Sequence, residues 1–178
     1  SLRGAMESTP QAKFTAVPAD AKLPTKYGDF RIRSYIDPMN GAEHAAIYLG
    51  DMNEQNPPLV RVHSECLTGD ALGSLRCDCG PQLQQALKRI QQEGRGIVLY
   101  LRQEGRGIGL FAKMQAYNLQ DRGLDTLDAN LALNLPADGR DYKIAAHMLN
   151  DIGYESIRLM TNNPDKVEQL ERHGINVV

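Results

Sequence analysis

The chain has 178 residues, of which 42% are hydrophobic and 24% charged, and its formal net charge at pH 7 is −2. This length allows one compact domain or two very small ones, and the near-neutral charge excludes binding to nucleic acid through overall basicity. No run approaches the roughly 18 apolar residues of a membrane span, and no signal peptide is recognisable at the start. We therefore expect a cytoplasmic protein with neither nucleic-acid nor membrane partners.

The first third of the chain predicts a flexible arm followed by strands. Residues 1–21 mix small, polar and proline residues without periodicity, which is typical of an arm. Three runs with the composition of short strands follow, over residues 29–37, 43–51 and 58–66. Turn residues separate them. We expect these runs to form an antiparallel region.

After residue 80 the pattern alternates between helices and strands. Pro81 suits the first turn of a helix, and a helical apolar face continues from it to Gly94. The apolar run 96–101 predicts a buried strand. Further helices are expected within 110–123, 126–136, 142–153 and 163–174, and strands at 156–160 and 175–178. The order predicts a mixed α/β fold, with N-terminal antiparallel strands followed by alternating helices and strands around a mixed sheet. Because the sequence stops within an expected strand, we expect the natural protein to continue.

Three cysteines, Cys66, Cys77 and Cys79, form the clearest candidate for a metal site. Their odd number and close spacing differ from a disulfide framework. Thiolates suit tetrahedral Zn²⁺, and catalytic zinc sites commonly keep a fourth position for water. His63 is the nearest candidate for a further ligand, but on a strand it would face away from Cys66. His44, His147 and His173, in other elements, are the alternative candidates. Three reduced buried cysteines without metal are the alternative.

Two junctions between a strand and a helix are candidates for binding phosphate. Residues 102–109 combine glycines with Arg102 and Arg106 just before a helix, although a plain flexible turn would have a similar composition. Lys166 stands in the first turn of the helix that follows residue 163, where a cation is slightly unfavourable for the helix dipole. A ligand would explain this position, and so would simple solvation of the lysine.

The stretches 61–70, 73–80, 102–109 and 161–164 together resemble GTP cyclohydrolase II of riboflavin biosynthesis. The resemblance covers residues 22–178, which we expect to form a single catalytic domain. It implies zinc-dependent hydrolysis of GTP, which opens the imidazole ring and releases formate and pyrophosphate to give a diaminopyrimidine ribosylamino phosphate. It also implies that the three cysteines hold the zinc, that Mg²⁺ accompanies the triphosphate, and that the enzyme is a homodimer.

The same resemblance implies roles for individual residues. Asp138 would be the proton acceptor, Arg140 the nucleophile toward the α-phosphate, and Tyr117 a residue near the base. From the sequence alone, residues 138–141 would instead form a helix N-cap with a surface ion pair. The positions that match contacts to GTP are Arg61, Val62, His63, Ser64, Glu65, Gln82, Glu104, Gly105, Arg106, Thr126, Thr161 and Lys166.

The chemistry of ring opening sets further expectations. Water must add at C8 of the purine, and zinc can supply it as hydroxide. Three thiolates would leave the zinc centre with a net negative charge, so we expect a nearby acid or base, for which Glu65 and Tyr117 are candidates. Pyrophosphate release is a separate substitution at phosphorus, stabilised by arginines and Mg²⁺. Because a guanidinium stays protonated in water, Arg140 would need desolvation and a base such as Asp138 to act as a nucleophile.

Three alternatives remain open from the sequence, one of which is a pathway variant that uses GTP but yields another product. A zinc nucleobase deaminase fits the H-x-E pattern of residues 63–65, but that class requires a C-x-x-C pair where this chain has C-x-C. A deaminase would release ammonia instead of formate. A non-catalytic GTP-binding paralogue with a structural zinc is the second alternative, and a zinc with four protein ligands would favour it.

Overall fold

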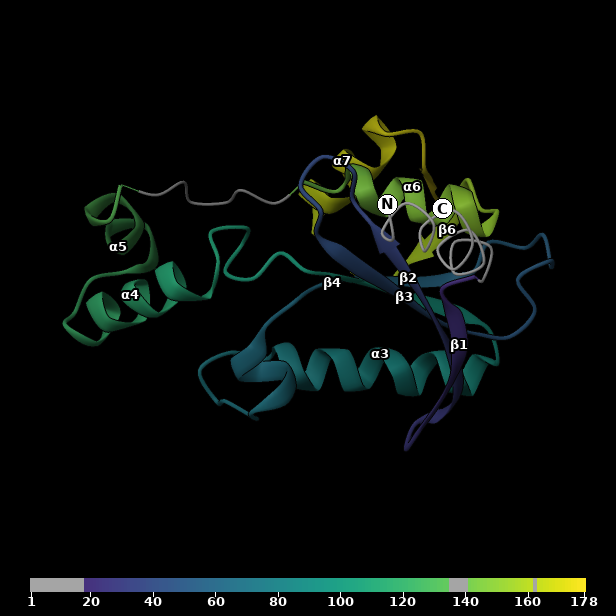
Figure 1. Cartoon of the computed structure of the whole chain (residues 1–178), viewed down its shortest axis with the longest axis horizontal. Coiled ribbons are helices and arrows are strands. Elements are labelled where there is room, and N and C mark those ends of the chain that lie inside the picture. Colours follow the sequence, from purple (N-terminus) through teal and green to yellow (C-terminus); the bar gives the residue numbers. More distant parts are fainter. Residues whose placement is uncertain (1–17, 135–140, 162) are drawn as a thin grey trace, which may run out of the picture.

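The computed structural model describes residues 18–134, 141–161 and 163–178. These residues form a seven-stranded mixed sheet with helices on both faces (Figure 1), which confirms the expected mixed α/β class. The strands are β1 Asp20–Thr25, β2 Gly28–Ile36, β3 Glu43–Leu49, β4 Leu59–Ser64, β5 Gly96–Leu101, β6 Ser156–Leu159 and β7 Asn176–Val177. The helical elements are the π-helical turn η2 Leu67–Ala71 and the helices α3 Cys79–Glu93, α4 Leu110–Asp121, α5 Thr126–Ala132, α6 Lys143–Ile152 and α7 Pro164–Arg172.

The strand order is β1-β2-β3-β5-β4-β6-β7, with an antiparallel half and a parallel half. β1, β2, β3 and β5 pair antiparallel, whereas β4 pairs parallel with both β5 and β6. The sequence interpretation that placed residues 58–66 in the antiparallel region was therefore wrong. The chain passes from β4 to β5 through helix α3, and such a crossover returns it in the same direction.

Strand β1 was not predicted, and it begins within the segment expected to be a flexible arm. Its residues pair with β2 from Asp20 to Thr25. Pro24 lacks a backbone donor, which a strand at the edge of a sheet tolerates. The Asp20 carboxylate binds Arg31 and Arg33 of β2 at 2.8 Å each. These ion pairs add side-chain contacts to the backbone pairing of this edge.

The predicted helices are confirmed, and their ends follow the local signals in the sequence. Helix α3 ends at Gly94, which has a left-handed φ of 82° that glycine adopts without strain. Asp125 caps α5 by accepting a hydrogen bond from the backbone of Asp128 at 2.7 Å. Asn163 caps α7 in the same way, directly before Pro164.

Two apolar layers lie on opposite faces of the sheet. On one face, side chains of β4 and β5 pack against α6 and α7, with Met148, Leu149 and Leu170 fully buried. On the other face, Val98 and Phe30 pack against Ile90 and its neighbours on α3. Successive residues of β5 therefore contribute to different layers, which explains why this strand is a continuous apolar run.

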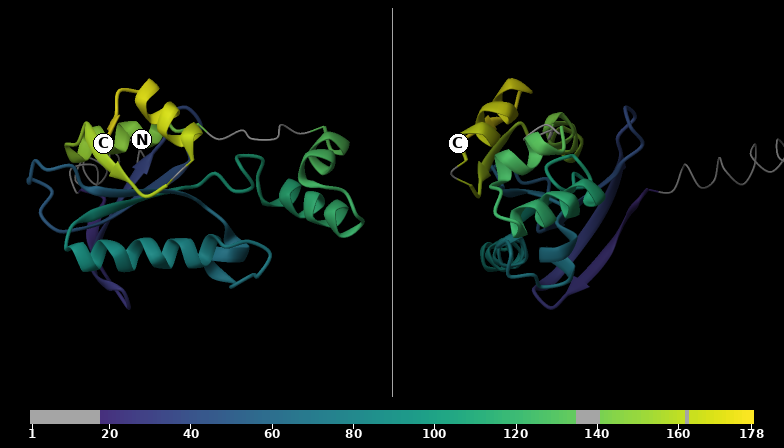
Figure 2. Two further views of the ribbon diagram at one scale, coloured as in Figure 1. Left: turned by 180° about the vertical axis from the view of Figure 1, so that it is seen from behind. Right: turned by 90° about the vertical axis from the view of Figure 1, so that its left-hand side faces the viewer.

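Helices α4 and α5, which we call the helical arm, project from the sheet beyond the carboxyl ends of β4 and β5 (Figures 1 and 2). The two helices pack against each other. Two loops lie between the arm and the sheet: the cysteine loop, residues 65–79, which follows β4, and the glycine-rich loop, residues 102–109, which follows β5. Among the helices that the structure describes, none combines the length and apolar character needed to cross a bilayer.

Candidate active site

The candidate site lies where the parallel strands β4 and β5 end. The last residues of the two strands, Ser64 and Leu101, are register partners, and the backbone of Glu65 then donates to the carbonyl of Leu101 at 2.7 Å. The loops that follow the strands therefore start side by side. In open α/β sheets, ligands bind outside the carboxyl ends of the strands.

The three cysteines form a compact cluster in this position. Cys66 Sγ lies 3.6 Å from Cys77 Sγ, and the three sulfur atoms are all within 4.8 Å of one another. In a tetrahedral zinc site with Zn–S bonds of about 2.3 Å, sulfurs are separated by about 3.8 Å. Among the described residues, no histidine or carboxylate joins the group. The donor set fits zinc with three protein ligands.

Two glycines allow the cysteine loop to fold this tightly. Cys66 precedes η2, and Cys79 is the first residue of α3. A Cβ atom at Gly69 would lie 2.7 Å from Cys77 Sγ, and one at Gly80 would lie 2.4 Å from the carbonyl oxygen of Gly69. Any larger residue at either position would push η2 away from α3.

The pKa values of Cys66 and Cys79 indicate that a cation would stabilise the ionised cluster. Burial opposes ionisation of Cys66, but hydrogen bonds with Thr68, the backbone of Gly69 and Lys113 outweigh it and lower its pKa. Burial, together with the neighbouring sulfurs, raises the pKa of Cys79 to about 12. A divalent metal would remove this penalty, because metal binding favours the deprotonated thiolate.

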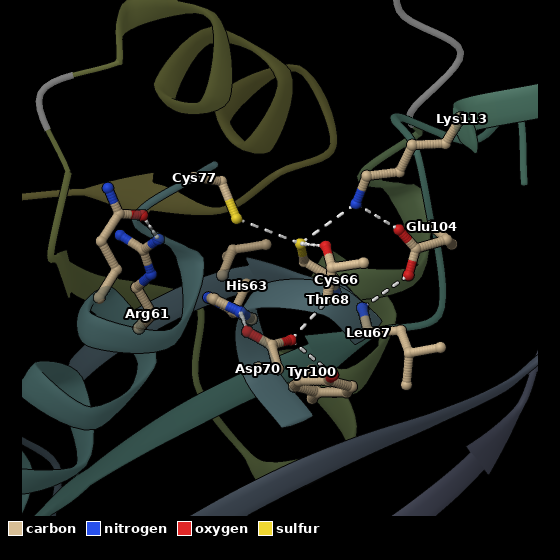
Figure 3. Close-up of polar contacts among 12 residues, drawn as sticks. Arg61, His63, Cys66, Leu67, Thr68, Asp70, Cys77, Tyr100, Glu104 and Lys113 are labelled. Carbon is tan, nitrogen blue, oxygen red and sulfur yellow. Dashed lines mark hydrogen bonds and ion pairs between the residues drawn. The ribbon is translucent and has the colours of Figure 1, made fainter. Parts of the chain in front are cut away.

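His63 faces a hydrogen-bond network beneath the cluster and does not reach the sulfurs (Figure 3). Its Nε2 atom lies 2.9 Å from Asp70 Oδ1. Asp70 Oδ2 accepts hydrogen bonds from the backbone of Cys66 at 3.0 Å and from the Tyr100 hydroxyl at 2.7 Å. The His63 ring stacks on Tyr100 at 5.6 Å between centroids. Asp70 and Tyr100 received no role from the sequence, because only the fold brings them to Cys66.

Glu104 links the two loops and the helical arm. Its Oε2 atom accepts a hydrogen bond from the backbone of Leu67 at 2.8 Å, and its Oε1 atom lies 2.7 Å from Lys113 Nζ. Lys113 Nζ also lies 3.1 Å from Cys66 Sγ (Figure 3). Burial works against the charge of Lys113, but its contacts with Glu104 and Cys66 outweigh it and raise the pKa. Lys113 was missed because nothing in its local sequence differs from a helix surface lysine.

A cleft of about 400 Å³ opens beside the cluster and gathers most of the residues singled out from the sequence. Besides the three cysteines it is lined by Arg61, His63, Ser64, Glu65, Gln82, Gly105, Arg106, Tyr117, Thr126 and Lys166. Arg76 and Lys113, which were not predicted, line it as well. The cleft thus joins residues from β4, the cysteine loop, the glycine-rich loop, α7 and the arm.

Three of the expected site residues that the structure describes do not line this cleft. Val62 is buried in the core, so only its backbone is near the cleft. Glu104 lines a neighbouring cavity, and Thr161 lines an adjoining groove next to Arg61 and Gln82. Asp138 and Arg140 fall outside the described residues. These are the two positions that were expected to govern chemistry at the α-phosphate.

The cleft is strongly cationic. Arg61 donates a hydrogen bond to Gln82 Oε1 at 2.7 Å, and the buried Lys166 donates to the carbonyl of Val62 at 3.1 Å. Arg106 adopts a left-handed φ of 60°, which non-glycine residues rarely do and which functional sites often retain. With Arg76 and Lys113, five cations line one small cleft. Such an arrangement favours a polyanion such as a triphosphate.

Comparison with known proteins agrees with this geometry. A family model described as GTP cyclohydrolase II matches residues 16–178. A riboflavin biosynthesis protein RibBA from Salinispora arenicola is 58% identical over 160 residues, which is 89% of this chain and 38% of that protein. A GTP cyclohydrolase-2 from Neisseria meningitidis is 54% identical over 90% of this chain and 81% of its own length. A GTP cyclohydrolase-2 from Haemophilus influenzae is 55% identical over 90% of this chain and 74% of its own length.

Proposed function

The chain belongs to the GTP cyclohydrolase II family of enzymes, and on that basis we propose that it hydrolyses GTP in the cleft beside the cysteine cluster. The imidazole ring would open with release of formate and pyrophosphate, leaving a diaminopyrimidine ribosylamino phosphate, the first step of riboflavin biosynthesis. One observation carries the proposal: three thiols and five cations line the same cleft. Ring opening needs an activated water, and a triphosphate needs positive charge.

Cys66, Cys77 and Cys79 would hold one zinc ion, which supplies a Lewis acid for the addition of water at C8. Glu65 is the candidate for moving the proton, since it lines the cleft next to Cys66 and forms an ion pair with Arg102. Tyr117, which also lines the cleft, is the alternative.

Arg61, Arg106 and Lys166 would bind the triphosphate, together with Mg²⁺. They approach the cleft from β4, the glycine-rich loop and α7, so they can contact different phosphate groups. The remaining proposed contacts to GTP are Val62 through its backbone, His63, Ser64, Gln82, Glu104, Gly105, Thr126 and Thr161. Asp138 and Arg140 are proposed to govern pyrophosphate release.

We also propose a homodimer in the cytoplasm. Clustered reduced thiols suit a reducing compartment. The arm has a groove of about 800 Å³ lined by apolar and amide residues, including Leu110, Phe111, Met114 and Leu119. Phe111 is 79% exposed. An apolar surface that lacks charged residues is typical of the interface between copies of one chain. Analytical ultracentrifugation of the protein and of Phe111→Glu tests this, and a monomer in both cases would contradict it.

The test of the proposed function is incubation of the zinc-loaded protein with GTP and Mg²⁺, followed by mass analysis of the products. Formate, pyrophosphate and the diaminopyrimidine are expected. Release of ammonia, with the triphosphate left intact, would instead support a deaminase. Tight binding of GTP without turnover would support a non-catalytic paralogue with a structural zinc.

A further inference from the structure

The helical arm is attached to the rest of the molecule in an unusual way. Its helices pack against each other, and Ala116 is the buried residue of α4. The large apolar side chains Phe111, Leu127 and Leu131 are exposed. Apolar burial against the sheet therefore contributes little to the orientation of the arm. Within a single chain, polar contacts must therefore hold Tyr117 and Thr126 at the cleft.

Arg76 provides one attachment, from the cysteine loop to the arm. Its Nη1 atom lies 2.8 Å from Asp121 Oδ1, and its Nη2 atom donates to the carbonyl oxygen of Tyr117 at 3.0 Å. Its guanidinium carbon lies 4.1 Å from the centroid of the Tyr117 ring. The ion pair alone is exposed and worth little. The carbonyl contact and the stacking are directional, and both fix Tyr117 itself.

Lys113 provides the second attachment, in the opposite direction, from α4 into the loops. Its ammonium group contacts Cys66 Sγ and Glu104, and Glu104 holds the backbone of Leu67 (Figure 3). The side chains of Lys113 and Glu104 are only 12% and 9% exposed, so solvent and salt screen this pair weakly. One buried cation thus connects the arm, the glycine-rich loop and the cysteine loop.

We propose that Arg76 and Lys113 are positioning residues that fasten the helical arm to the cysteine loop and thereby keep Tyr117 and Thr126 at the cleft. Both attachments end on the cysteine loop, at Arg76 and at Cys66. The order of this loop depends on the three-sulfur cluster, and metal binding contributes to the folding of such sites. Occupancy of the metal site therefore governs how firmly the arm is held. The relevance of this attachment to catalysis rests on the proposed function, whereas the attachment itself does not.

Hydrogen exchange measured by mass spectrometry tests the attachment without GTP. In the unmodified protein, removal of zinc by a chelator should speed exchange of the amides in α4 and α5 by roughly tenfold, about what the loss of one charged hydrogen bond produces. Amides of β5 should change little. In Lys113→Met and Arg76→Met, the arm should exchange fast even with zinc bound, and the chelator should add little. Lys113→Arg should retain most of the protection.

Two controls keep the result interpretable. Lys88→Met removes an exposed lysine of α3 that lies over the Tyr27 ring, outside the cleft, and it should behave as the unmodified protein. The zinc content of each variant, measured by elemental analysis, separates a loosened arm from lost metal. Equal arm exchange with and without zinc, or full protection in zinc-loaded Lys113→Met, would overturn the inference. Zinc-dependent arm protection in a protein that releases no formate would leave the inference intact and refute only the proposed function.

Discussion

Asp70 Oδ1 lies 2.9 Å from His63 Nε2, and the other oxygen of the same carboxylate accepts a hydrogen bond from the backbone of Cys66. A single buried side chain thus connects the end of β4 with the start of the cysteine loop. The hydrogen bonds from His63, Tyr100 and Cys66 outweigh the cost of burial and lower the pKa of Asp70. The carboxylate is therefore ionised at neutral pH, where it accepts all three hydrogen bonds.

We predict that Asp70→Asn weakens zinc binding by about 10- to 100-fold, as is usual when a residue that orients a metal ligand is lost. An amide has one acceptor oxygen and two donor hydrogens, so it cannot accept from three donors. Competition with a chromophoric chelator measures the affinity. Asp29→Asn, which alters an exposed residue of β2, is the matched control. Unchanged zinc affinity in Asp70→Asn would show that the network does not position Cys66.

The purified protein should carry one zinc per chain, bound by three sulfur atoms and one lighter atom. This follows from the three-cysteine cluster, which no other histidine or carboxylate of the described residues joins. X-ray absorption at the zinc edge counts the ligands. Four sulfurs, or a protein that takes up no zinc, would contradict the prediction.

Removing the charge of Arg106 or Lys166 should weaken GTP binding by about tenfold or more, because charge-assisted hydrogen bonds contribute about 1.5–3 kcal/mol. Guanosine, which lacks phosphates, should bind nearly unchanged. Titration calorimetry with Arg106→Met and Lys166→Met measures both ligands, and Lys26→Met, at the turn between β1 and β2, is the control. Equal losses for GTP and guanosine would place these residues away from the triphosphate.

The stability of the protein should fall as the pH drops below about 6.5, with His44 as one cause. Burial, assisted by the charge of Arg102 and opposed by Asp37, lowers the pKa of His44. The folded state therefore binds fewer protons than the unfolded state. The stabilisation is fully present above the unfolded pKa of about 6.5 and is lost as the pH falls through the lower folded value.

The variant His44→Gln should flatten this dependence between about pH 7 and pH 5. Glutamine keeps an acceptor for the backbone of Arg102, which His44 Nδ1 accepts at 3.0 Å, but it does not titrate. Urea denaturation at several pH values gives the free energies of unfolding. His147→Gln, which replaces an exposed histidine in the same way, is the matched control. A slope unaltered by His44→Gln would assign the acid sensitivity to other groups.

The sequence predicted the local elements well because their signals are local. Helix α3 and strand β5 follow directly from apolar periodicity, and Gly94 and Asp125 mark helix ends through their own backbone preferences. Strand β1 was missed because Pro24 interrupts its pattern, and only the pairing with β2 stabilises it. The parallel direction of β4 depends on the crossover through α3, which residue spacing within the strand does not encode.

In the candidate site, too, the sequence predicted the features that have local signals and missed those that depend on tertiary contacts. The cysteine spacing indicated a metal cluster, and the resemblance identified most residues of the cleft. Lys113 lies 47 residues from Cys66 along the chain, and its role depends on how the arm docks. Arg76 is adjacent to Cys77, yet its partners on α4 are more than 40 residues away. Contacts of this kind need the tertiary structure.

The purine ring is proposed to open at the three-cysteine cluster. The test uses GTP labelled isotopically at C8, so that nuclear magnetic resonance detects labelled formate, and pyrophosphate is assayed in parallel. The two proteins compared are the zinc-loaded protein and Cys66→Ser, whose folding is first checked by circular dichroism. The account predicts labelled formate from the unmodified protein and none from Cys66→Ser, in which some pyrophosphate release survives because that step takes place at phosphorus. Equal loss of both products would show that the two steps are coupled through the zinc. Labelled formate from a folded, metal-free protein would contradict the account.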